Sequence, residues 1–184
     1  MPALPFLQYT TQRKGDIMAD LRTRSHVLDK PKIKELLQSK RDGVLSFTNG
    51  TTAYGVPLGY AYYDNNKDIL YFGMNPTGRK FDYFTACKQV CFTMYQTFPS
   101  SGDQLRMGWW SIILDGELAQ VTAPEEINAL ADWMDAKGLF PPGLKEKFLS
   151  AILKDPQKSN FFKMHITAMG GKEMPEYRPE DEGK

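Results

Sequence analysis

The sequence predicts a mainly β fold, a small antiparallel barrel with helices added between its strands. Two observations carry this prediction. Short apolar or alternating segments are separated by turn-forming sequences such as Asn49-Gly50 and Asp64-Asn65-Asn66-Lys67. Helical patterns are inserted between some of these segments, and no internal repeat or low-complexity stretch interrupts them.

Six strands are expected, at residues 44–48, 54–63, 69–72, 90–96, 110–121 and 161–168. Asn49-Gly50 between the first two predicts a type I′ hairpin. Pro57 cannot donate a ladder hydrogen bond, so the second strand should lie at a sheet edge or carry a bulge there. Asp115-Gly116 interrupts the long fifth strand, and Gly170-Gly171 should follow the end of the sixth.

Four helices are expected. The first should begin after Asp29 as N-cap, with Pro31 in its first turn. Its apolar positions then recur at the i, i+3, i+4 spacing of an amphipathic helix. The second covers residues 78–86 with Thr77 as N-cap. The third begins with a capping-box pattern at Thr122 and continues to about 135, and the fourth covers about 144–153.

The chain of 184 residues has the length and composition of one globular domain. We expect an N-terminal arm over residues 1–28, the barrel domain over 29–173 and a charged tail over 174–184. Lys and Arg total 23 against 22 Asp and Glu, so the formal charge is only +1. This balance argues against nucleic acid or an anionic membrane surface as a partner.

Two further classes of protein are not expected. No apolar run approaches the ~20 residues of a membrane helix, and residues 1–9 do not form a secretory signal, so a cytoplasmic location is predicted. Cys87 and Cys91 have no companion cysteine, and the chain has 2 His. These are too few ligands for a structural zinc site, so we expect no metal and two reduced thiols.

The segment Thr77-Gly78-Arg79-Lys80 is a candidate anion site. It follows a strand and opens a helix, where exposed amides and the positive end of the helix dipole favour an anion. The alternative is a solvated helix start. However, two cations at a helix N-terminus oppose the dipole, so their presence favours a bound anion.

The segments around this site resemble the FMN-binding split-barrel superfamily of pyridoxamine phosphate oxidase. Within it they are most similar to the nitroimidazole-resistance (Nim) type flavoproteins. Tyr54–Leu58 is similar to a PY-x-VPL strand, and Ile69–Phe72 leading to Gly78-Arg79-Lys80 is similar to a strand-then-GRK element. Trp110–Ile113 followed by Gly116 is similar to a later SV-x-x-G-x-A strand. The resemblance implies a six-stranded antiparallel split β-barrel with added helices.

The resemblance also implies a homodimer with two FMN sites in clefts between the subunits. Arg79 and Lys80, behind Gly78, would hold the FMN phosphate. The isoalloxazine ring would lie along the backbone of two segments, Val56, Pro57 and Leu58 in one and Phe72, Gly73 and Met74 in the other. Trp110 and Ser111 fall where the superfamily places strand residues near the flavin.

Two departures from the family pattern limit what the resemblance implies. Many Nim-type sequences carry a histidine where this chain has Gly73. The substrate-phosphate segment of the oxidase is not recognisable in the C-terminal MPEYRPEDEGK. Pyridoxamine phosphate oxidase activity is therefore not expected, and no catalytic residue is assigned.

The expected function is an FMN-dependent oxidoreductase that reduces a small, flat, electron-poor molecule such as a nitroaromatic. The cofactor would carry the hydride or electron chemistry, and the protein would anchor and orient it. Two alternatives remain open. The chain could be a flavin-binding carrier or sensor without turnover, or the same barrel could bind haem or a deazaflavin.

Overall fold

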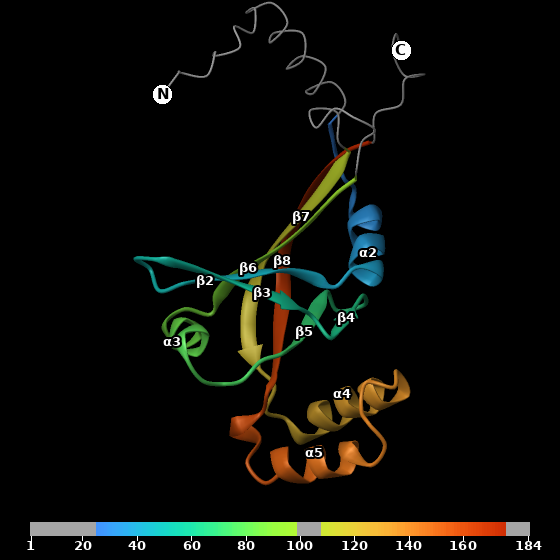
Figure 1. Ribbon diagram of the computed structural model, residues 1–184. Coiled ribbons are helices and arrows are strands. Elements are labelled where there is room, and N and C mark those ends of the chain that lie inside the picture. The colour runs from blue at the N-terminus through green and yellow to red at the C-terminus, as the bar shows by residue number, and fades with distance from the viewer. Residues whose placement is uncertain (1–24, 99–107, 176–184) are drawn as a thin grey trace, which may run out of the picture.

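The computed structural model describes residues 25–98 and 108–175. In this part of the chain the strands form one antiparallel sheet of order β3-β2-β6-β7-β8-β5-β4, and β1 pairs with β8 (Figure 1). The strands are β1 His26–Val27, β2 Asp42–Thr48, β3 Ala53–Gly59, β4 Tyr62–Asp64, β5 Ile69–Gly73, β6 Gln89–Thr97, β7 Trp109–Gln120 and β8 Phe161–Met174.

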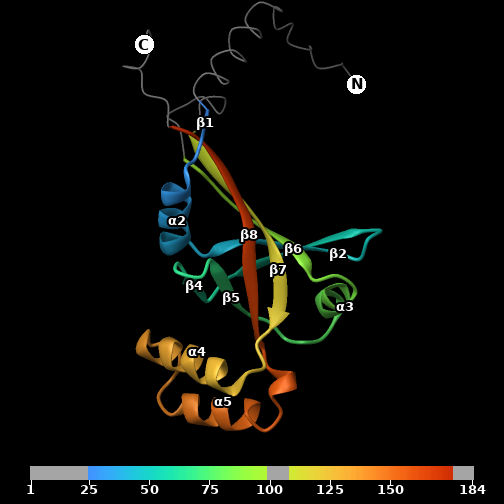
Figure 2. The same cartoon turned by 180° about the vertical axis from the view of Figure 1, so that it is seen from behind.

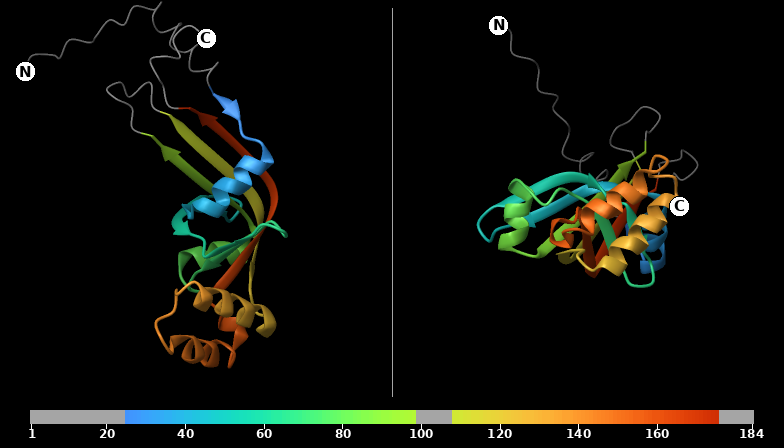
Figure 3. Two further views of the ribbon diagram at one scale, coloured as in Figure 1. Left: turned by 90° about the vertical axis from the view of Figure 1, so that its right-hand side faces the viewer. Right: turned by 90° about the horizontal axis from the view of Figure 1, so that it is seen from below.

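The helices occupy three separate places around this sheet. They are α2 Lys30–Ser39, α3 Arg79–Ala86, α4 Pro124–Ala136 and α5 Leu144–Ile152, with a short 3-10 turn η2 at Pro156–Lys158. Figures 1 and 2 show α2 beside the upper part of the long strands and α3 on the other side of the molecule. In both, α4 and α5 form a hairpin at the lower end. Figure 3 shows from a third direction that this hairpin covers one end of the barrel. No helix among the described residues has the length and apolar character needed to cross a membrane.

The mainly β antiparallel prediction is confirmed, but the predicted number of six strands is wrong, because the sheet has eight. One added strand is β1. The other arises because the predicted strand 54–63 divides into β3 and β4. The Tyr60 N–H donates to the Arg41 carbonyl, and the next N–H, of Ala61, donates to the Tyr71 carbonyl. The chain therefore changes partner from β2 to β5 within two residues, and this change curls the sheet into a barrel.

Strand β8 is longer than predicted, because it continues through Gly170-Gly171 to Met174. It pairs with β7 along its length and with β5 and β1 on its other side. A Cβ at Gly171 would lie 3.0 Å from both Leu28 Cδ1 and the Ser111 carbonyl oxygen. Close approach of Leu28, which follows β1, and of β7, rather than a chain turn, therefore explains this glycine.

The predicted type I′ turn at Asn49-Gly50 is wrong, whereas the predicted N-cap at Asp29 is confirmed. Asn49-Gly50 does lie in a hairpin, but the loop has four residues and only Gly50 has a positive φ, 88°, whereas a type I′ turn needs two. The Asn49 side chain instead accepts from the N–H groups of Thr51 and Thr52. Asp29 caps α2 through a 2.9 Å bond from the Lys32 N–H, as predicted.

The other two predicted N-caps are wrong. The N-cap of α3 is Gly78 rather than Thr77, with φ 76°. The N-cap of α4 is Ala123 rather than Thr122. No side chain of the described residues forms a cap bond with either helix, so their first N–H groups depend on the backbone, on water or on a ligand.

The protein has two apolar cores, and β5 contributes to both. Leu70 and Phe72 point into the barrel, and Ile69 and Tyr71 point toward the α4–α5 hairpin. Burial on both faces explains why Ile-Leu-Tyr-Phe is apolar throughout instead of alternating. The barrel core centres on Phe92, whose ring packs edge-on against those of Tyr60 and Phe72.

Candidate functional site

Strand β3 ends the sheet, and no described strand pairs with its outer side, which we call the free edge. Every second residue of β3 points its backbone N–H and C=O groups to this free edge. The Asn49 N–H donates to the Thr52 carbonyl at one end of the β2–β3 register, and the Tyr60 N–H donates to the Arg41 carbonyl at the other. Because hydrogen-bonded and non-hydrogen-bonded pairs alternate, the even-numbered residues of β3 bond to β2. The outward groups therefore belong to the odd-numbered residues, which are Ala53, Gly55, Pro57 and Gly59.

The predicted ring-lining residues of β3 consequently differ in role. Pro57 has its carbonyl at the free edge, and its missing N–H costs the β2–β3 ladder nothing. This confirms the edge placement predicted from its sequence. Val56 and Leu58 use their backbone groups toward β2, while their side chains pack against the barrel core.

The N-terminus of α3 is open. Asp82 N–H and Phe81 N–H both donate to the Gly78 carbonyl, and no side chain caps the first turn. A Cβ built on Gly78 meets no atom of the described residues within 4 Å. The free amides of this turn, together with the positive end of the helix dipole, are suited to an anion.

The Arg79 side chain is exposed, yet aromatic residues hold it in place. Its guanidinium carbon lies 4.4 Å from the ring centroid of Tyr54 on β3 and 5.5 Å from that of Tyr83 on α3. Its Nη2 also donates to Tyr83 Oη at 3.5 Å. This cation–π contact joins the helix start to the free edge of the sheet.

A chain of hydroxyl contacts supports this arginine. Tyr83 Oη lies 2.6 Å from Thr52 Oγ1, which in turn donates to Asn49 Oδ1 at 3.2 Å. The hydrogen bond from Arg79, and then the one with Thr52, lowers the pKa of Tyr83 below its usual range. Neither Thr52 nor Tyr83 was predicted from the sequence as a site residue. Tyr83 could have been predicted, because it lies four residues after Arg79 on one helix and such pairs are neighbours.

Lys80 lies beside Arg79 but is held less firmly. Its Nζ reaches the Thr77 carbonyl at 3.5 Å. Asp82 in the same turn carries a carboxylate that opposes an anion. The three side chains Arg79, Lys80 and Asp82 nevertheless leave a net positive charge at the helix start.

The predicted segment Phe72, Gly73 and Met74 leads into this helix start. Phe72 and Met74 are buried in the barrel core, so their side chains face away from solvent. The Met74 N–H donates to the Asn160 carbonyl, in register with the β5–β8 ladder. Since hydrogen-bonded pairs alternate along the β5–β8 ladder, the backbone N–H and C=O of Gly73 point away from β8. On that side β4 pairs only with residues 69–71 of β5, so Gly73 lies beyond the β4–β5 pairing.

We predict that Gly73→His will be tolerated. Gly73 is exposed, its φ is not positive, and a Cβ there meets no described atom within 4 Å. The free energy of unfolding, measured by urea denaturation, should change by about 0.5 kcal/mol or less.

The matched control for this prediction is Gly116→Ala, where a new Cβ would lie 2.3 Å from the His165 carbonyl oxygen. That variant should lose about 1–3 kcal/mol. Equal destabilisation of the two variants would show that position 73 is not open.

Trp110 and Ser111 are not brought near α3 within one chain. On β6 they pair with Gln96 and Tyr95. Tyr54, by contrast, pairs with Phe47 of β2, which pairs with Val90 of β6. Six residues along β6 separate Val90 from Gln96, which is about 20 Å of strand. The Trp110 side chain is also buried in the barrel core.

The profile of the pyridoxamine 5'-phosphate oxidase family matches residues 29–173 of this chain. That range covers nearly all of the sheet and every helix described above. The chain belongs to this family. No curated protein matches the sequence.

Solved structures share the family fold. An FAD-binding protein of Mesorhizobium loti is 22% identical with a TM-score of 0.56, over 82% of this chain and 99% of its own. A candidate 5-nitroimidazole antibiotic resistance protein of Bacteroides thetaiotaomicron is 19% identical with a TM-score of 0.63, over 81% and 87%. A flavocytochrome of Azotobacter vinelandii is 13% identical with a TM-score of 0.60, over 88% and 73%. At these identities the likeness establishes the split-barrel fold.

Proposed function

We propose that this family member is a flavoprotein that binds FMN between α3 and the free edge of β3. The observation that carries the proposal is the uncapped start of α3, with Arg79 held over Tyr54 beside it. Free amides and a preoriented guanidinium suit a terminal phosphate dianion. Family membership and the flavin-binding proteins among the structural neighbours support the choice of ligand.

The isoalloxazine ring would lie along the edge of β3. Gly55 and Gly59 present N–H groups there, and Pro57 presents a carbonyl, so donors and acceptors are both available to the ring heteroatoms. Glycine and proline also keep this edge free of large side chains on the strand face they share. These features let the chain bind and orient the ring without a dedicated side chain.

We further propose that the protein is an oxidoreductase acting on a small, flat, electron-poor molecule of the nitroaromatic type. When bound, the flavin supplies hydride or electron chemistry. The chain's own contribution is to anchor the phosphate at Arg79 and Lys80 and to hold the ring against β3. The likeness to the Bacteroides protein supports this substrate class.

A second candidate function is a flavin-binding carrier or sensor. The observation that favours it is Gly73, which offers no side chain at the position where many Nim-type sequences carry a histidine. Anaerobic acceptor screening distinguishes the two functions. Passage of electrons from NAD(P)H or dithionite-reduced flavin to a nitroaromatic supports the oxidoreductase. Bound flavin that transfers electrons to no acceptor supports the carrier.

The direct test of cofactor binding is the absorption spectrum of the purified protein. One FMN per subunit should give the absorption spectrum of an oxidised flavin. A colourless protein that takes up no added FMN would overturn the proposal. A haem or deazaflavin spectrum would replace FMN with one of the alternative cofactors while leaving the barrel assignment intact.

We propose that the protein works as a homodimer, formed through the outer face of the sheet. Paired residues on neighbouring strands place one set of side chains on this face, and we call the central part of this set the uncharged face. It consists of Val44, Ser46, Gly55, Pro57, Cys91, Thr93, Tyr95, Ser111, Ile113 and Gly170. None of these residues is charged, and Tyr95 is 73% exposed and Ile113 50% exposed. Charged residues border them on the same face: Asp115 pairs with Cys91, and Lys172 pairs with Ser111. A continuous exposed patch without charge that extends over five strands and has a charged rim is typical of a subunit interface.

Such a dimer would complete the flavin site. Within one chain Trp110 and Ser111 lie far along the sheet from α3, and Ser111 belongs to the uncharged face. Ser111 would contact the flavin in the cleft formed with the second subunit, whereas the buried side chain of Trp110 would support Ser111 from the barrel core.

Ile113→Glu should shift the dimer toward monomer. The substitution places a carboxylate at the centre of the uncharged face, where burial without a partner is costly. Sedimentation velocity of the variant should show a concentration-dependent loss of dimer. Leu139→Glu is the matched control, because Leu139 is also exposed, at 44%, but lies in the α4–α5 loop. Wild-type protein that sediments as a monomer with flavin bound would refute the dimer.

A further inference from the structure

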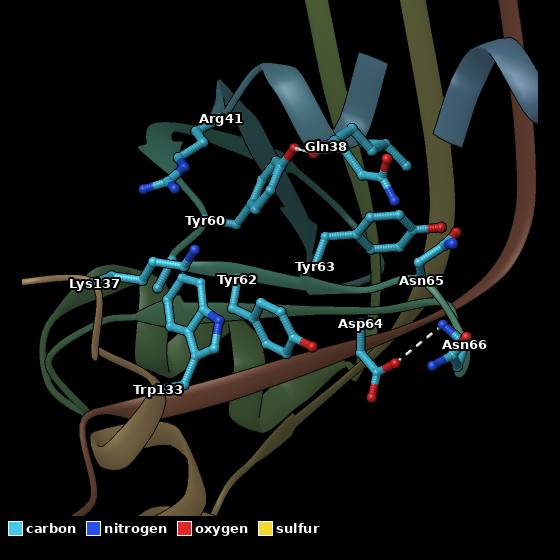
Figure 4. A pocket seen from close by; sticks show the side chains of 12 residues that line it. Gln38, Arg41, Tyr60, Tyr62, Tyr63, Asp64, Asn65, Asn66, Trp133 and Lys137 are labelled. Carbon is cyan, nitrogen blue, oxygen red and sulfur yellow. Dashed lines mark hydrogen bonds between the residues drawn. The ribbon is translucent and has the colours of Figure 1, made fainter. Parts of the chain in front are cut away.

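A second pocket lies between the barrel and the α4–α5 hairpin. Its volume is about 410 Å³, which is in the range of small-molecule sites. Three parts of the chain form it: the end of α2, the segment that carries β4, and the C-terminal half of α4 (Figure 4). The lining residues are Leu37, Gln38, Arg41, Tyr60, Ala61, Tyr62, Tyr63, Asp64, Asn65, Asn66, Trp133 and Lys137. None of them belongs to the proposed flavin site.

Aromatic rings form the wall of this pocket. The rings of Tyr62 and Trp133 lie 4.6 Å apart at 37°, and Tyr62 stacks on Tyr71 behind it at 5.8 Å and 17°. The Tyr60 hydroxyl donates to main-chain carbonyls at the end of α2, of Leu37 and Lys40. These contacts fix the rings, so a flat ligand could lie against them at low cost in side-chain entropy.

Two cations lie on one side of the pocket. Figure 4 shows Arg41 and Lys137 together on this side, and Asn65 and Asn66 opposite them. Both cationic side chains are exposed, and neither forms an ion pair with any residue in the described ranges. Like charges placed at one site repel each other, so an anion that approaches both is favoured.

The one acidic residue of the lining does not offset these cations. The Asp64 carboxylate accepts from the N–H groups of Asn66 and Lys67, and it pairs with Lys67 Nζ at 3.5 Å. It lies on the asparagine side in Figure 4. The pocket is therefore aromatic in its middle, cationic on one side and amide-bearing on the other.

We propose that this pocket binds a flat aromatic anion, of the class of aromatic carboxylates, at a site separate from the flavin. The ring of the ligand would lie against Tyr62 and Trp133, and its carboxylate would face Arg41 and Lys137. Guanidinium and ammonium groups both bind carboxylates. At the other end of the ligand, the side-chain amides of Asn65 and Asn66 would form hydrogen bonds with a polar substituent.

The test is isothermal titration calorimetry of the full-length protein, with excess FMN present, using 2-naphthoate and its uncharged analogue 2-naphthamide. We expect naphthoate to bind about tenfold more tightly, because two exposed ion pairs are individually weak but act together. The double variant Arg41→Gln, Lys137→Met should remove this difference. Lys147→Met is the matched control, since Lys147 is an exposed lysine on α5 outside the pocket.

Three results would overturn the proposal: equal binding of both probes by the wild type, no binding of naphthoate, or a preference that persists in the double variant. Arg79→Ala together with Lys80→Ala should leave naphthoate binding unchanged. Loss of the preference in that variant would place the probe at the flavin site instead. Circular dichroism of each variant checks that these exposed substitutions leave the fold intact.

Discussion

Replacing Arg79 and Lys80 together by alanine is expected to release the flavin. The double variant removes the guanidinium held over Tyr54 and the neighbouring ammonium, and leaves Asp82 as the only charged side chain in the first turn of α3. Charge-assisted hydrogen bonds to phosphate are among the strongest polar contacts in proteins. We expect the dissociation constant for FMN to rise about a hundredfold or more, measured by quenching of flavin fluorescence.

The matched control for this variant is Lys147→Ala together with Lys154→Ala, which removes two exposed cations that lie in or just after α5 and outside the proposed flavin site. It should retain flavin like the wild type. Tyr83→Phe provides an intermediate case, because it keeps the ring beside Arg79 but removes the hydroxyl contact. Full flavin retention by the Arg79 and Lys80 double variant would mean that the phosphate binds elsewhere.

Phe92→Ala is expected to have the largest effect on stability. Phe92 is fully buried at the centre of the barrel, where its ring contacts those of Tyr60 and Phe72. Truncating a buried phenylalanine removes its packing and leaves a cavity, so the free energy of unfolding should fall by about 3–5 kcal/mol. Urea denaturation followed by circular dichroism measures this loss.

Gln89→Ala is the control on the same strand, because Gln89 is exposed at the start of β6. Its effect should be within about 0.5 kcal/mol. A loss of less than 1 kcal/mol in Phe92→Ala would indicate that the barrel centre collapses around the missing ring.

The sequence predicted the elements whose signals are local. Strand β6 alternates apolar and polar residues, and its buried residues Val90, Phe92 and Met94 follow that pattern. Helix α2 has its apolar stripe and its cap in adjacent sequence. The division of residues 54–63 into β3 and β4 could not be predicted from local sequence. It depends on the hydrogen bond from the Ala61 N–H to the Tyr71 carbonyl, which is ten residues away in the chain.

In the candidate site, too, residues with a local sequence signal were predicted and residues brought together only by the fold were not. The GRK sequence places Arg79 at a helix start, and the structure confirms that position. Thr52 could not be connected to Tyr83 from sequence, because 31 residues separate them and only the β2–β3 hairpin brings them together. The pocket at Trp133 gave no sequence signal either, since its lining comes from three separate elements.

The position of Pro57 has a consequence for solubility. A sheet edge with unpaired N–H and C=O groups is a template on which another chain can add a strand. Pro57 removes one donor from the free edge of β3 while the ladder to β2 stays complete. The residue that leaves room for a ligand along this edge thus also discourages strand addition when that ligand is absent, and so protects the newly made chain from aggregation.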